Sequence, residues 1–178
     1  MIEMLIGTGE SIGVGPGPGT WHLEDDEWYY CAKDAAELKD ICSAFLNDTN
    51  PNQIRTVTRS GESHDIPLNN IDTRYVTNMS SMFNGATNFN QNISNWNTSN
   101  VTNMVWMFWR ASSFNQNISN WNVSNVTNMN EMFRQATNFN QNLSKWCVTK
   151  IRSKPGNFEG GSKLTAANLP RWGTCPNG

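Results

Sequence analysis

Apolar residues recur with a fixed period through the middle of the chain. Three consecutive segments of 25 residues align without insertion or deletion: VTNMSSMFNGATNFNQNISNWNTSN (76–100), VTNMVWMFWRASSFNQNISNWNVSN (101–125) and VTNMNEMFRQATNFNQNLSKWCVTK (126–150). A fixed period of this size indicates structural units that each bury an apolar face against their neighbours. We call these segments the first, second and third copies.

Spacing within a copy predicts two short elements. In the second copy the apolar residues first fall on one face of a two-turn helix: Met104, Met107, Phe108 and Ala111. Asn103 is a candidate N-cap for this helix. We expect a short strand at about 118–122, with equivalents at 93–97 and 143–147. One strand and one helical or 3₁₀ turn per copy is typical of leucine-rich-repeat solenoids.

The shared apolar positions predict the core. Four sets of equivalent residues have the same phase in every copy, so we expect each set to be buried: Met79, Met104 and Met129; Phe83, Phe108 and Phe133; Phe89, Phe114 and Phe139; Trp96, Trp121 and Trp146. A second hypothesis concerns the recurring Asn90, Asn115 and Asn140, which we expect to bond turn backbone.

Weaker versions of the pattern flank the three copies. Shifting by one period places Ile54, Val57, Leu68 and Ile71 on apolar positions, so residues 51–75 resemble a degenerate coil. After Lys150, Phe158, Leu164 and Trp172 continue the pattern. Prolines in 151–178 would prevent further strand addition at this end. Together the segments predict about five coils.

The N-terminal third has a different character. Residues 1–20 are rich in Gly and Pro, which predicts an extended arm. Residues 21–50 predict a cap, with a strand at 27–31 and then a helix that begins at Asp34 and Glu37, residues spaced as in a capping box. The overall prediction is an α/β solenoid, leucine-rich-repeat-like, with an arm (1–20), a cap (21–50), a repeat region (51–150) and a last degenerate coil (151–178).

Composition and charge narrow the function classes. The net charge is −2 and the pI about 5.6, which does not favour nucleic-acid binding. No apolar stretch is long enough to span a membrane, and Glu3 stands where a signal peptide would have basic residues. We therefore expect no membrane insertion and no signal peptide. A virion surface or an extracellular location is the expected site of action.

Four cysteines lie outside the recurring apolar positions and lack the spacing of a zinc site. Four cysteines allow three pairings. The local one, Cys31 with Cys42 and Cys147 with Cys175, would link each end of the repeat region; the alternative is four reduced, buried thiols.

The repeat closely resembles the 25–26-residue repeat of the BspA-like bacterial surface proteins, also called the DUF285 or Mycoplasma lipoprotein-type repeat. The shared motifs are MF, FNQ, the Trp and SNVTNM, which recur in register over 76–150. The resemblance implies a leucine-rich-repeat-like solenoid used in adhesion or recognition, without catalytic residues. Where the family typically has Asp, this chain has amides: Asn92, Asn97, Asn117 and Asn122. Cation-dependent binding implied by the family is therefore not carried over to this chain.

Candidate binding residues are those that depart from the repeat. The variable positions of the second copy are Val105, Trp106, Trp109 and Arg110, which lie off the apolar face of the predicted helix. Exposed Trp and Arg are enriched at binding hot spots. We expect these four residues to form a protein or glycan interface; the alternative is that the arm or the cap covers them within the chain.

These observations favour a non-enzymatic recognition or structural module. The first hypothesis is a phage or virus component (tail, fibre or capsid surface) that acts in assembly or host attachment, and the second is a secreted cell-surface adhesin. Partners would be other structural proteins or a host receptor or glycan, and a homo-oligomer is an open alternative. No catalytic, metal or cofactor site is predicted. The carboxylates at 24–27 are interpreted as a solvated turn; a polysaccharide-degrading enzyme that uses them is the remaining alternative.

Overall fold

Regular secondary structure is confined to the two ends of the described chain. The computed structural model describes residues 16–46 and 54–176. One sheet contains β1 (Thr20–Glu24), β2 (Glu27–Cys31) and β5 (Ile71–Asp72), in the order β1-β2-β5. β1 and β2 are antiparallel, and β2 pairs with β5 in parallel. The other sheet is the antiparallel pair of β3 (Ile54–Arg59) and β4 (Glu62–Pro67). The remaining elements are α1 (Ala35–Ser43) and two 3₁₀ turns, η1 (Leu68–Asn70) and η2 (Ala166–Asn168).

The strand and helix expected near the N-terminus are confirmed. β2 occupies the predicted 27–31. Asp34 caps α1, because its Oδ1 accepts a hydrogen bond of 2.8 Å from the Glu37 N–H. The apolar face of the helix is buried, including Leu38 and Phe45. Between β1 and β2, the carboxylates of 24–27 form the predicted exposed turn, in which Asp25 and Asp26 have φ of 50° and 62°.

The described part of the segment predicted as a degenerate coil, residues 54–75, does not form one. From Ile54 onward the chain makes the β3–β4 hairpin, whose turn residues Ser60 and Gly61 have φ of 54° and 82°. Ile54, which the pattern placed in the core, is 58% exposed. The apolar spacing also fits a strand with one buried face, and Ser-Gly supplies the hairpin turn.

The predicted α/β solenoid of about five coils is wrong. Between Thr73 and Thr165 the structure contains turns and isolated bridges but no strand or helix, so neither the helix at 104–111 nor the strands at 93–97, 118–122 and 143–147 exist. Two residues of each copy lie in the left-handed region, which a right-handed helix does not allow; in the second copy these are Trp106 and Arg110, with φ of 56° and 59°. The leucine-rich-repeat-like architecture was predicted from one helix and one strand in each copy, so its prediction is wrong as well.

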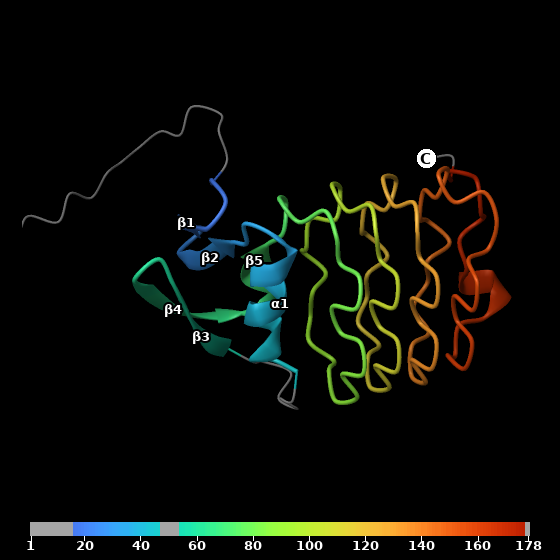
Figure 1. Ribbon diagram of the computed structural model, residues 1–178, viewed down its shortest axis with the longest axis horizontal. Coiled ribbons are helices and arrows are strands. Elements are labelled where there is room, and N and C mark those ends of the chain that lie inside the picture. The colour runs from blue at the N-terminus through green and yellow to red at the C-terminus, as the bar shows by residue number, and fades with distance from the viewer. Residues whose placement is uncertain (1–15, 47–53, 177–178) are drawn as a thin grey trace, which may run out of the picture.

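Backbone donors of the copies pair in two ways: some bond to a carbonyl of their own turn, as the Met107 N–H does to Met104, and others bond to the next copy. The Phe83 N–H donates to the Met107 carbonyl, and the Phe108 N–H donates to the Met132 carbonyl, both at 2.9 Å. The indole N–H of Trp121 crosses in the opposite direction, to the Ile93 carbonyl at 3.1 Å. These bonds hold the three copies side by side as irregular loops (Figure 1).

The predicted core positions are confirmed. The Met, Phe and Trp residues of the four sets are between 0% and 4% exposed. Phe108 stacks on Phe83 at a ring-centroid distance of 5.4 Å and on Phe133 at 5.5 Å. It also stacks on Phe114 of its own copy at 4.0 Å. Offset aromatic stacking therefore runs along the whole set of copies as well as within each one.

The asparagine hypothesis is confirmed for Asn90 and Asn115. The Oδ1 of Asn90 accepts from the Asn115 N–H at 2.9 Å, and the Oδ1 of Asn115 accepts from the Asn140 N–H at 3.0 Å. Asn115 also accepts from the Gln141 amide at 2.9 Å. Asn90 and Asn115 thus each satisfy a backbone donor of the following copy, whereas the Asn140 Oδ1 accepts from the Asn168 side-chain amide at 3.0 Å.

The C-terminal segment, described from Ile151 to Pro176, packs against the third copy (Figure 1). The Phe133 N–H donates to the Phe158 carbonyl at 2.8 Å, and the Leu143 N–H donates to the Asn168 carbonyl at 2.9 Å. The Phe158 ring lies 5.3 Å from the Phe133 ring, edge to face. Apart from the short η2, residues 151–176 contain no helix or strand.

Candidate functional site

The four candidate residues of the second copy, which we call the Trp106 patch, differ in exposure. Trp106 is 45% exposed and Arg110 is exposed, whereas Val105 and Trp109 are half-buried. The Arg110 guanidinium lies over the Trp109 ring, 4.3 Å from its centroid. This contact is a cation–π interaction that fixes the orientation of both side chains. The four residues therefore lie on two turns and not on the surface of the predicted helix.

The turns of the patch are held from both sides by neighbouring copies. The Trp106 N–H donates to the Asn130 carbonyl at 3.1 Å, and the Arg110 N–H donates to the Arg134 carbonyl at 2.9 Å. On the other side, the Trp109 carbonyl accepts from the Gly85 N–H at 2.7 Å. Each left-handed residue is thus anchored by a cross-copy bond, so the patch is preorganised.

The polar surroundings of the patch come from the third copy. The Arg110 Nε donates to the Gln135 Oε1 at 2.8 Å. Glu131 and Arg134 form an ion pair at 2.6 Å beside it. The Trp109 indole N–H is buried and has no hydrogen-bond partner among the described residues. An unpaired buried donor costs free energy, so an acceptor that reached this nitrogen would recover that cost.

Cover of the patch within the chain is limited in the described structure. The cap residues 16–46 leave Trp106 45% exposed. The rest of the predicted arm, residues 1–15, lies outside the described residues, as do residues 47–53 of the predicted cap boundary.

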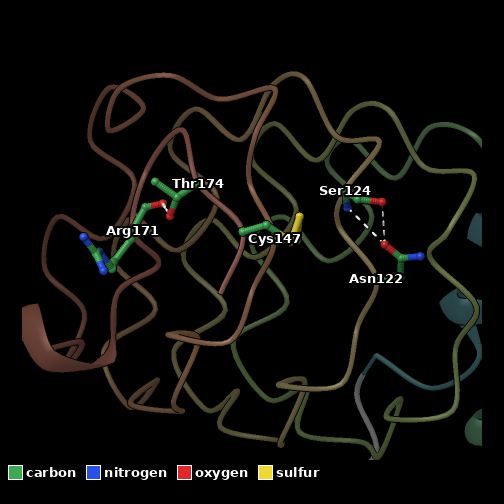
Figure 2. The surroundings of a disulfide bond; sticks show 6 residues. Asn122, Ser124, Cys147, Arg171 and Thr174 are labelled. Atoms are coloured by element: carbon green, nitrogen blue, oxygen red, sulfur yellow. Dashed lines mark hydrogen bonds between the residues drawn. A yellow bond between two sulfur atoms is a disulfide. The ribbon is translucent and has the colours of Figure 1, made fainter. Parts of the chain in front are cut away.

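The cysteines form one disulfide. Cys147 and Cys175 are bonded and join the third copy to the C-terminal segment; Figure 2 shows the surroundings of this bond, with Cys147 labelled. Cys31 and Cys42 are buried free thiols, so the second pair of the local scheme is absent. Burial raises the pKa of Cys31 to about 12 and that of Cys42 further. Both thiols are therefore protonated at neutral pH and unreactive.

The asparagines at the positions where the resemblance implies acidic residues accept hydrogen bonds from nearby backbone N–H groups. Asn122 Oδ1 accepts from the Ser124 N–H at 3.1 Å and from its hydroxyl at 2.7 Å, and Figure 2 shows both bonds. Asn92, Asn97 and Asn117 accept in the same way from the residue two positions on. An aspartate would offer the same acceptor, so the amide keeps the turn and removes the charge.

Each of the two histidines packs against aromatic rings. His64 stacks on Trp28 at 3.8 Å and lies 4.5 Å from Trp21, an aromatic cluster of β1, β2 and β4. His22 stacks on Tyr29 at 5.3 Å. Partial burial lowers the pKa of His22, and Asp72 and Glu24 oppose this shift.

Sequence reasoning missed a hollow beside that aromatic cluster. It has a volume of about 290 Å³, and its lining includes Trp28, Ile54 and the carboxylates of Asp26, Glu27 and Asp65. Trp28 is 37% exposed. The alternation of residues 54–59 could have indicated this surface, because it predicts a strand with one exposed face.

The described residues contain no group of three or more His, Cys, Asp or Glu side chains that could hold a metal ion. In the same part of the chain, no helix has the length and apolar character needed to cross a membrane.

Comparison with known proteins gives one match. The family model described as a Mycoplasma protein of unknown function, DUF285, matches residues 43–172. No curated protein and no solved structure matches the chain. The matched range contains the three copies, the β3–β4 hairpin and most of the C-terminal segment, and on this evidence the chain belongs to the DUF285 family.

Proposed function

We propose that this protein is a non-enzymatic recognition module and that the Trp106 patch is its binding surface. One observation carries the proposal: the same pair of left-handed turns occurs in all three copies, and only the second copy places tryptophans on it. The equivalents of Trp106 and Trp109 are Ser81 and Asn84 in the first copy. Packing therefore does not require large aromatic residues at these positions.

The chemistry of the patch fits a macromolecular partner. Trp and Arg are the residue types most enriched at the energetic centres of interfaces. Arg110, which is stacked on Trp109 and bonded to Gln135, offers a cation with a fixed direction. Since cross-copy bonds hold the turns, binding would require little ordering of the backbone.

The finer part of the proposal concerns where the module acts. We propose display on a virion, as a tail, fibre or capsid-surface component that contacts other structural proteins or a host receptor or glycan. The alternative is a cell-surface adhesin, which the resemblance of the repeat to BspA-like surface proteins favours. Gold-labelled antibody against the protein, applied to virus particles and to cells of the source, distinguishes the two settings.

The binding proposal is tested with Trp106→Ser and Trp109→Asn in one variant, which places the residues of the first copy in the second. Fluorescently labelled protein is titrated onto intact particles or cells of the source and onto a glycan array. We expect binding by the natural chain and a loss of about tenfold or more in the variant. The control, Leu23→Ser with Tyr75→Ser, removes two exposed large side chains outside the patch and should bind as the natural chain does.

Circular dichroism and the unfolding temperature must be unchanged in both variants for the comparison to count. Equal binding by the natural chain and the Trp106→Ser/Trp109→Asn variant would refute the patch as the binding surface. Hydrolysis of a polysaccharide, abolished by changing the carboxylates of 24–27, would refute the non-enzymatic part.

A further inference from the structure

The hydrogen bonds between copies are interrupted where the C-terminal segment begins. The Met79 N–H donates to the Asn103 carbonyl, and the Met104 N–H donates to the Asn128 carbonyl, each at 2.9 Å. The equivalent donor of the third copy, the Met129 N–H, bonds to no backbone carbonyl in the described chain. The parallel bridges that join Asn78, Asn103 and Asn128 also end there.

The bonds in the opposite direction stop at the same place. The Thr127 N–H donates to the Thr102 carbonyl at 2.9 Å, but among the described residues the Arg152 N–H donates to no backbone carbonyl. Pairing resumes at the Glu131 N–H, which donates to the Gly156 carbonyl at 2.9 Å. The start of the third copy and the start of the C-terminal segment are therefore not joined by backbone hydrogen bonds between Met129 and Arg152.

A change in sequence explains the gap. Each copy begins Val-Thr-Asn-Met, whereas the C-terminal segment begins Ile-Arg-Ser-Lys at 151–154. Lys154 stands at the position of Met129, and a lysine cannot enter the buried set of methionines unless its charge is paired. Pro155, which follows, has no N–H to contribute.

The gap is a hollow with a volume of about 380 Å³. It lies between residues 127–130 and 150–156, and its charged lining is basic: Lys150, Arg152 and Lys154. All three side chains are exposed. Arg152 makes no hydrogen bond or ion pair with a described residue, Lys150 donates to the Asn125 amide oxygen at 2.7 Å, and Lys154 is paired with Glu159.

The surrounding charge reinforces the positive character of the hollow. Residues 145–176 contain six basic side chains against one acidic residue, Glu159, although the whole chain has a net charge of −2. An anion that approaches this end meets an attractive potential, and one that approaches the acidic N-terminal region does not.

We propose that this hollow binds a phosphate group, either free or within an anionic polymer. The Arg152 guanidinium offers paired donors that match two phosphate oxygens, and the ammonium groups of Lys150 and Lys154 add point charges. The site is separate from the Trp106 patch and does not depend on the function proposed for it.

The test uses isothermal titration calorimetry of the full chain in a phosphate-free buffer. The two probes are inorganic phosphate and a short linear polyphosphate. The site variant is Arg152→Thr with Lys154→Met, which restores the residues of the third copy. The control is Lys145→Asn with Lys163→Asn, which removes the same charge outside the hollow and restores asparagines found in earlier copies.

We expect the site variant to bind at least about tenfold more weakly and the control to change less than about twofold. Glu159→Gln frees Lys154, so it should bind more tightly than the natural chain. Binding of polyphosphate alone identifies a polymer as the ligand, and binding of both probes identifies the phosphate group itself. Lack of binding to either probe, or equal weakening in the site variant and the control, overturns the proposal.

Discussion

The N-terminal region and the three copies satisfy their backbones in different ways. In residues 16–46 and 54–72, donors pair within α1 or between adjacent strands. In the three copies, donors such as the Phe83 N–H pair with the next copy, 24 residues on. Every buried donor needs a partner in both regions, but only the first region finds it in regular secondary structure.

This difference determines what each region tolerates. A helix or a hairpin depends on a few local signals, such as the cap at Asp34, so local changes should have local effects. A copy without regular structure depends on its neighbours, so the loss of one shared side chain should weaken several copies together. The predictions below test this contrast.

The largest effect is expected for Phe108→Ala. The Phe108 side chain is fully buried and stacks on rings of its own copy and of both neighbouring copies. Its loss should lower the free energy of unfolding by about 3–5 kcal/mol, measured by urea denaturation. Leu23→Ala, at a side chain that is 55% exposed, is the control and should change it little. A loss below about 1 kcal/mol for Phe108→Ala would contradict a continuous core through the copies.

The Phe108 position also shows what the sequence predicts well. An apolar residue that recurs at the same position of all three copies is expected to be buried whatever the backbone conformation of the copy. The core can therefore be predicted from the periodicity alone. The helix at 104–111 failed because spacing cannot reveal left-handed residues unless a glycine marks them, and Gly85 marks one turn only in the first copy.

The candidate sites show the same division. The Trp106 patch was recognisable because aligned copies expose any departure from the repeat, and the structure leaves Trp106 exposed. The basic hollow has a comparable signal in the sequence, because Lys154 stands at the position that Met129 occupies in the third copy. Its shape depends on which cross-copy bonds are missing, which no single sequence shows.

The second largest effect is expected from removal of the disulfide. Cys147→Ser with Cys175→Ser opens a link that spans 28 residues, and the free energy of unfolding should fall by about 2–4 kcal/mol. Urea denaturation with and without reductant measures this loss. Reductant should destabilise the natural chain and leave the variant unchanged, because its remaining thiols are already reduced. A reductant-insensitive natural chain would contradict the prediction.

Asn115→Ala tests a bond that crosses between copies. Its Oδ1 accepts from the Asn140 N–H and from the Gln141 amide. Because two donors of the third copy lose their acceptor at an exposed site, we expect a loss of about 1–2 kcal/mol and a lower unfolding temperature. Asn115→Asp keeps the acceptor and should retain most of the stability. An unchanged unfolding temperature in Asn115→Ala would refute a structural role for the asparagines.

Asp34→Ala tests a hydrogen bond within the N-terminal region, the one that the Asp34 side chain accepts from the Glu37 N–H at the start of α1. Loss of the N-cap should lower stability by about 1 kcal/mol, and Asp34→Asn, which keeps the acceptor oxygen, should lower it less. Hydrogen exchange should accelerate in α1 while amides of the copies keep their protection. If Asp34→Ala and Asn115→Ala accelerated exchange in the same residues, the contrast between local and shared stabilisation would fail.

The smallest effect is expected for Gly85→Ala, which tests how much of the glycine's role is backbone freedom. Gly85 has φ of 74°, and no atom lies within 4 Å of the position that a Cβ would occupy. The equivalent Arg110 and Gln135 already place side chains on the same turn, both with φ of 59°. We therefore expect a loss of only about 0.5–1 kcal/mol, from the left-handed conformation itself. The reciprocal Arg110→Gly relieves the same left-handed conformation but loses the stacking on Trp109 and the bond to Gln135, so we expect a net loss of less than about 1 kcal/mol in the same urea titration. A loss above about 2 kcal/mol for Gly85→Ala would show that the first copy differs from the others at this turn, so that a patch like that of Trp106 could not be transferred to it.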